Sequence, residues 1–170
     1  MQKQDLAHWK CKAKLLKYNE DITPFAREGR EAEFHKLFKP YEVREIEGNL
    51  LLNEGIDEMW DLVTGAGGTA YNNTNARIGV GNGTAAADAT QTGLQGGSTA
   101  FKAMEGGYPT STSQKVTFKS SFGDAEANFA WEEWTVDNGS TPDKNLNRKV
   151  ESLGTKSTGT WTLEVSITLS

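Results

Sequence analysis

Strict alternation of apolar and polar residues predicts a β-strand at the C-terminus, over residues 161–169. A period of two places alternate side chains on the same face of a strand. We therefore expect five apolar residues to face the core: Trp161, Leu163, Val165, Ile167 and Leu169. Shorter runs with the same pattern predict further strands at 41–47, around Ile78 and Val80, at 100–104 and at 115–122.

The pattern over residues 129–136 contains an irregularity. Alternation places Phe129 and Trp131 on one face and Trp134 and Val136 on the other. One extra residue near Glu132 or Glu133 would bring all four onto the same face. We therefore expect a β-bulge at this point.

One helix is predicted between the strands. Ile56, Met59, Trp60 and Val63 recur at the spacing of a single helical face, so we expect that face to pack on the sheet. Asn53 is a suitable N-cap, and Gly65 is a suitable C-cap.

The first 40 residues differ from the remainder. Their apolar pattern is imperfect, Thr23-Pro24 interrupts it, and only 25–38 has helical spacing, up to Pro40. We interpret residues 1–40 as an extended arm with one short helix, which orders on a partner protein. Six apolar residues are the candidate contacts: Trp9, Leu15, Leu16, Phe34, Leu37 and Phe38. The alternative is that the helix packs back on its own body.

Several short strands, glycine-rich turns and one helix predict a mainly β fold. We expect a β-sandwich or jelly-roll-like body over residues 41–170 with one packed helix, preceded by the arm. Strand order cannot be deduced from this pattern.

A run of small residues follows the Ile78–Val80 strand. Gly79 and Gly81 match the first two positions of a dinucleotide-binding fingerprint, but Thr84 occupies the third and no apolar helical stripe follows. A structural turn is therefore the preferred interpretation. The segment 84–99 cannot form a core of its own, so it is either a long ordered loop or a contact surface for another chain.

Charge is distributed unevenly. Residues 1–17 hold five lysines and one aspartate, a local charge of +4, so the rest of the chain carries −9 of a net charge of −5. The basic segment would favour an acidic partner surface, whereas the acidic body argues against nucleic-acid binding. No apolar window is long enough for a membrane span.

The sequence offers no convincing catalytic or metal-binding group. Glu132 and Glu133 are adjacent, but neighbouring strand residues point to opposite faces and cannot flank one bond unless a bulge re-aims them. His8 and His35 are isolated, and the single cysteine, Cys11, excludes an internal disulfide. Lys10 and Lys12 would lower the pKa of the Cys11 thiol in an ordered site, although an incidental thiol in a solvated arm is the favoured interpretation. We expect neither an enzyme nor a cofactor.

Four stretches carry a resemblance to virion structural proteins of tailed bacteriophages: 49–56, 76–83, 88–94 and 146–150. The resemblance covers about residues 49–170 and implies a structural role in the virion, after assembly in the host cytoplasm. It implies no catalytic residue. Such decoration proteins sit at symmetry axes, so the resemblance also implies self-association, with a trimer as the expected state.

The expected function is therefore that of a capsid decoration protein, which docks on the major capsid protein and self-associates. The candidate self-association loop contains Thr84, Thr90 and Leu94. Two other classes remain open: a tail- or tail-fibre-associated protein that binds a receptor or glycan, and a glycan-degrading enzyme.

Overall fold

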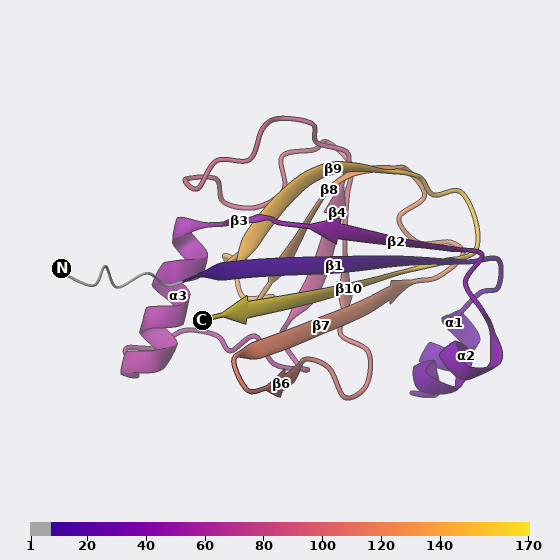
Figure 1. Ribbon diagram of the computed structural model, residues 1–170, viewed down its shortest axis with the longest axis horizontal. Coiled ribbons are helices and arrows are strands. Elements are labelled where there is room, and N and C mark those ends of the chain that lie inside the picture. Colours follow the sequence, from indigo (N-terminus) through magenta and orange to yellow (C-terminus); the bar gives the residue numbers. More distant parts are fainter. Residues whose placement is uncertain (1–7) are drawn as a thin grey trace.

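Two antiparallel five-stranded sheets pack face to face in the computed structural model, which describes residues 8–170 (Figure 1). The first sheet has the strand order β2-β1-β10-β7-β6, and the second has the order β3-β9-β8-β4-β5. The predicted mainly β fold is confirmed in its sandwich form. The elements are β1 (Trp9–Tyr18), α1 (Thr23–Ala26), α2 (Glu31–Leu37), β2 (Glu42–Glu47), β3 (Leu50–Leu51), α3 (Asn53–Thr64), β4 (Arg77–Gly81), β5 (Thr99–Ala103), β6 (Thr110–Thr112), β7 (Lys115–Phe122), β8 (Ala130–Asp137), β9 (Asn147–Thr155) and β10 (Thr160–Leu169).

The main core lies between the two sheets and is rich in tryptophan. Trp131 packs edge to face against both Phe122 and Trp161, with ring centroids 5.0 Å apart in each pair. Leu163, Val165 and Ile167 of β10 are buried in this core with Trp161. The predicted inward face of this strand is thus confirmed, except that Leu169 at its end is exposed.

The predicted β-bulge in β8 is present. The register between β8 and β9 shifts between Trp131 and Glu133, so Trp131, Trp134 and Val136 all reach the same core. Glu133 then points to the opposite face of the second sheet, where it is fully buried beneath a loop.

The interpretation of residues 1–40 as a separate arm is wrong for the described residues, 8–40. β1 is an interior strand of the first sheet, paired with β10 from Trp9↔Leu169 to Tyr18↔Thr160 and with β2 on its other side. Leu15 and Cys11 therefore face the core, whereas Lys10, Lys12 and Lys14 form a row on the outer face. Residues 1–7 lie outside the described part of the chain.

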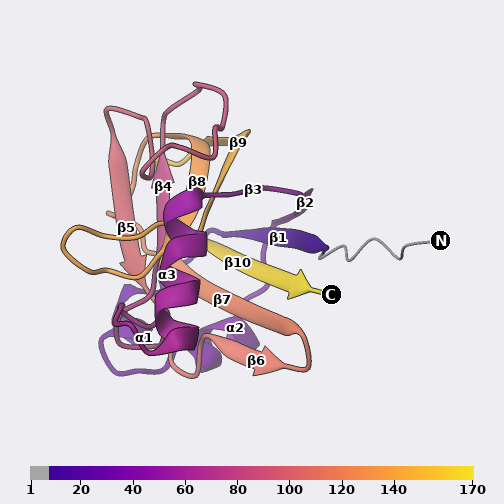
Figure 2. The same cartoon turned by 90° about the vertical axis from the view of Figure 1, so that its left-hand side faces the viewer.

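The helices cover different parts of this sandwich. α3 crosses one open end, beside the start of β1 and the end of β10 (Figures 1 and 2). α1 and α2 lie at the other end of the long axis (Figure 1). There they cover a second apolar cluster formed by Tyr18, Ile22 and Phe34.

Candidate functional site

Helix α3 begins at Asn53 and ends in a left-handed glycine cap. Gly65 has φ of 71° and its N–H donates to the carbonyl of Asp61, as the sequence predicts. The predicted N-cap is wrong, because Asn53 is the first helical residue and no side chain caps this end. Glu54 in the first turn instead accepts a hydrogen bond from the backbone N–H of Asn145, at 2.8 Å, and thereby ties α3 to the second sheet.

The face that α3 turns inward is not the predicted one. Gly55 lies so close to the body that an added Cβ would be 2.6 Å from the carbonyl oxygen of Leu146. Glu58 is also buried, and its Oε1 accepts hydrogen bonds from the N–H of Thr69 and the side chain of Asn138. Close backbone contact and a satisfied buried carboxylate therefore orient this helix, in addition to the packing of Met59 against the core.

Two large apolar residues of α3 consequently face solvent. Trp60 is 62% exposed and Val63 is 75% exposed. Their predicted packing on the sheet is wrong, and of the four residues expected there only Met59 packs against the main core. Asp57 and Asp61 are exposed on the same helix, and neither makes an ion pair within residues 8–170. We call Trp60, Val63, Asp57 and Asp61 the α3 patch: an apolar centre with an acidic border.

A groove of about 360 Å³ lies beside this helix. Met59, Val116, Leu146 and Ile167 form apolar parts of its wall, together with the exposed Leu169. Trp9 also lines the groove and donates a hydrogen bond from its indole N–H to Asn49 Oδ1, at 2.7 Å. The α3 end of the molecule thus offers both protruding apolar side chains and an apolar recess.

A second set of exposed apolar residues lies at the end of α2, in the turn that follows it and at the start of β2. Leu37 is 59% exposed, Tyr41 is 56% exposed and Val43 is 53% exposed. Lys36 and Lys39 flank Leu37, are exposed, and make no ion pair with the described residues. We call these five residues the α2 patch. The exposed acidic residues of the same stretch, Glu33 and Glu42, form ion pairs with Arg30 and Lys17, so within the described part of the chain the two lysines are the unpaired charges of residues 33–43.

The six predicted arm contacts are not brought together into one surface. Leu15 lies in the main core, and Phe34 is fully buried in the cluster under α2, where Leu16 and Phe38 pack against it. Trp9 lies at the α3 end. Leu37 alone among the six is largely exposed, so the alternative that this helix packs on its own body is the correct one.

A polar contact holds α2 to the first sheet. His35 Nε2 lies 2.8 Å from Glu105 Oε1, and Tyr18 Oη lies 3.0 Å from His35 Nδ1. Burial alone would raise the pKa of Glu105, but the hydrogen bond and charge of His35, with Lys119 and Ser121, keep that pKa below its usual value. Burial raises the pKa of the Tyr18 hydroxyl to about 12, so this group is a hydrogen-bonding group and a poor nucleophile.

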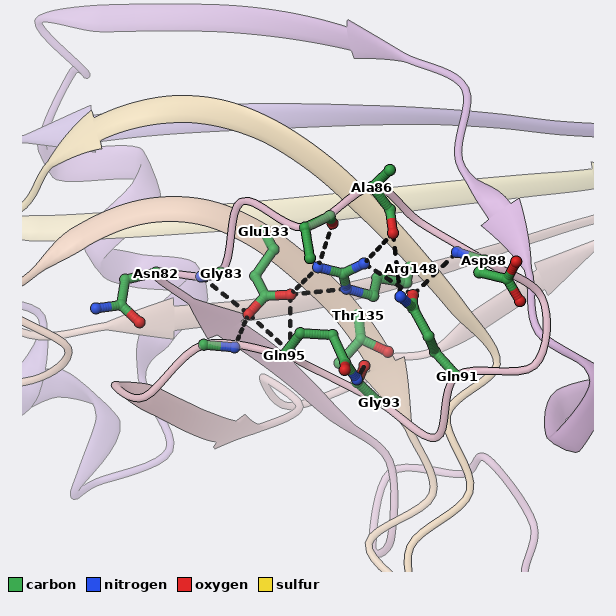
Figure 3. A network of polar contacts seen from close by, with 12 residues as sticks. Asn82, Gly83, Ala86, Asp88, Gln91, Gly93, Gln95, Glu133, Thr135 and Arg148 are labelled. Atoms are coloured by element: carbon green, nitrogen blue, oxygen red, sulfur yellow. Dashed lines mark hydrogen bonds and ion pairs between the residues drawn. The ribbon is translucent and has the colours of Figure 1, made fainter.

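The small-residue segment after β4 is an ordered loop fixed by a buried ion pair (Figure 3). Glu133 accepts backbone hydrogen bonds from Gly83, Gln95 and Gly96, at 3.1, 3.0 and 2.7 Å. Its other oxygen lies 2.7 Å from both Nε and Nη2 of Arg148, whose guanidinium also donates to the carbonyl of Ala85. Both charged side chains are fully buried. The carboxylate oxygens of Glu133 and the guanidinium nitrogens of Arg148 all have hydrogen-bonding partners inside the protein, as a buried ion pair requires.

The glycines of the fingerprint-like run have a structural explanation. A Cβ on Gly79 would be 2.5 Å from the ring of Phe101, and one on Gly83 would be 2.4 Å from Glu133 Oε1. The loop N–H groups that could receive a phosphate bind the carboxylate of Glu133 instead. Within the loop, Thr84 and Thr90 are exposed and Leu94 is half-buried. Self-association through these three residues stays a prediction.

The adjacent carboxylates are separated by the sheet. Glu132 accepts a hydrogen bond from Ser152 near the surface, at 3.0 Å, whereas Glu133 is buried with Arg148. Burial also raises the pKa of Cys11 to about 12, the opposite of the lowering that Lys10 and Lys12 suggested, because its side chain faces the core. Within residues 8–170, no group of three or more His, Cys, Asp or Glu side chains could hold a metal ion.

Comparisons of the chain with protein-family profiles, with curated proteins and with solved structures find no match. No helix among the described residues is long and apolar enough to cross a membrane. The α3 and α2 patches are therefore the candidate functional sites of the molecule.

Proposed function

We propose that this protein is a structural component of a bacteriophage virion. In this role it is a capsid decoration protein that docks on the major capsid protein and associates with copies of itself. The main support for the proposal is that large apolar side chains are exposed at both ends of the sandwich, although the sandwich already has a complete buried core. Contiguous exposed apolar groups with polar borders are typical of protein contact sites.

Internal hydrogen bonds that fix the long loop and α3 to the body support a structural role. The longest loop between strands is held by Glu133 and Arg148 with hydrogen bonds to its backbone, and α3 is held by Glu54 and Glu58. A subunit that is ordered before it assembles loses less conformational entropy on binding. The proposal that this role is in a phage particle is based on the sequence resemblance to tailed-phage virion proteins.

The surface aromatic residues disfavour the glycan-binding alternative. Trp131, Trp134 and Trp161 are buried in the core. Trp60 and Tyr41 are the most exposed aromatic side chains of residues 8–170. Trp60 belongs to α3, whereas Tyr41 immediately precedes β2, which begins at the opposite end of the molecule (Figure 1). A glycan platform would need such side chains side by side.

Density-gradient purification of phage particles from cells that carry the gene tests the proposal. The protein is expected to band with intact particles in a fixed ratio to the major capsid protein. Particles assembled without it should bind the purified chain when it is added back. Recovery of the protein only from the soluble lysate, with no binding to particles that lack it, would overturn the proposal.

A further inference from the structure

The two exposed patches are complementary in charge as well as alike in their apolar content. The α3 patch surrounds Trp60 and Val63 with Asp57 and Asp61, and no basic residue occurs in this helix. In the α2 patch, Lys36 and Lys39 are exposed sequence neighbours of Leu37, and the nearby Glu33 and Glu42 are each held in an ion pair. Opposite charges around apolar centres favour contact between unlike patches and fix their orientation.

The patches also lie where one cannot reach the other within a single molecule. Figure 1 shows α3 at one end of the long axis and α2 at the other, separated by the length of the strands. A contact between them must therefore join two molecules. In such a heterologous contact each copy uses a different surface and keeps its second patch free for a third copy.

We propose that copies of this protein associate head to tail, with the α2 patch of one copy seated on the α3 patch and the adjoining groove of the next. Leu37 and Tyr41 supply apolar contacts for Trp60, Val63 and the groove walls, while Lys36 and Lys39 face Asp57 and Asp61. This inference rests on the proposed function and assigns the surfaces of its self-association.

Charge argues against the symmetric alternative, in which two α3 patches pair with each other. That arrangement would bring two copies of Asp57 and of Asp61 together around a desolvated Trp60. Like charges placed together at an interface oppose association. The loop that contains Thr84 is a separate alternative, and the experiment below distinguishes it.

Sedimentation equilibrium of the purified chain tests the proposal through two exposed substitutions, Trp60→Asp and Leu37→Asp, in separate proteins. The wild type is expected to associate as its concentration rises, and each variant alone is expected to stay monomeric. An equimolar mixture should form a 1:1 heterodimer and nothing larger, because it contains one intact pair of patches. Circular dichroism verifies that each variant is folded.

Charge reversal supplies the second measurement. Lys36→Glu with Lys39→Glu should weaken self-association by roughly tenfold or more. Mixing this double variant with one carrying Asp57→Lys and Asp61→Lys should restore it. Thr84→Asp is the matched control, since it adds a charge to the loop and should leave association unchanged.

Three results would overturn the inference. They are a wild type that stays monomeric at about 1 mM, undiminished self-association of Leu37→Asp, and loss of association in Thr84→Asp. A protein that binds particles in the gradient experiment but stays monomeric would retain the proposed docking on the capsid and lose the proposed self-association, this head-to-tail contact included.

Discussion

At α3, Gly55 lies directly against the backbone of the body. Any side chain at Gly55 would overlap the backbone of Leu146, which cannot retreat as the end of a flexible side chain could. The carboxylate of Glu58 lies on the same buried face and is satisfied by Thr69 and Asn138. These two residues determine which side of the helix points outward and so leave Trp60 exposed.

We predict that Gly55→Ala destabilises the protein, although alanine is normally the better helix residue. Overpacking against a fixed backbone costs about 1–3 kcal/mol, and this should exceed the gain in helix propensity. Urea unfolding measures the change. Asp57→Ala, on the exposed side of the same helix, is the control and should change stability by less than about 0.5 kcal/mol. A Gly55→Ala protein as stable as the wild type would contradict the assigned orientation of α3.

A second residue-scale prediction concerns Asp137, at the end of β8. Burial raises its pKa to about 6 against the opposing hydrogen bonds and charge of Arg77, and the neighbouring Asp143 adds to the rise. Arg77 donates from Nε to Asp137 at 3.0 Å, and its Nη2 lies 3.6 Å from Asp143. The folded state thus holds this proton more tightly than the unfolded chain does.

Stability contributed by the Asp137 proton should be present at low pH and lost as pH rises from 3.8 to about 6. Asp143→Asn removes a negative neighbour, so the pKa of Asp137 should fall and the loss of stability across this window should shrink. Carboxyl ¹³C NMR titration measures the pKa. An unchanged or higher value in the variant would contradict the geometry of this cluster.

At the scale of elements, the sequence of β1 contains a strand signal that is weak. Lysines at 10, 12 and 14 alternate with Cys11 and Ala13, and this period of two was the available signal for a strand. The small inward residues and the outward Leu16 weakened the apolar contrast. The strand at 161–169 and the bulge in β8 were predictable because they contain large apolar residues. Only one strand geometry in each case places all of these residues on the core face.

The role of β1 in the core predicts a large effect of Leu15→Ala. Removing a fully buried leucine side chain should cost about 2–5 kcal/mol of unfolding free energy. Leu169→Ala in the paired strand β10 is the control, because Leu169 is exposed and its loss should cost about 0.5 kcal/mol or less. Equal effects of the two changes would mean that residues 9–18 are not an integral strand.

For the whole molecule, strand order depends on contacts that no local pattern reveals. β1 pairs with β10, so the first and last strands are neighbours in the same sheet. The α3 and α2 patches could not be predicted from local sequence patterns either. The sequence identifies Trp60 and Leu37 as apolar, but only the folded body shows that both stay exposed, at opposite ends and with opposite charge around them.

We expect both of these ends to be buried by protein contacts when the molecule is assembled on a particle. Hydroxyl-radical footprinting with mass spectrometry tests it directly, by comparing free protein with protein on purified particles. Trp60 and Tyr41 should both react in the free protein and both be protected after assembly, whereas the buried Trp131 should be protected in both states. Equal reactivity of Trp60 and Tyr41 before and after assembly would mean that the two ends are not contact surfaces.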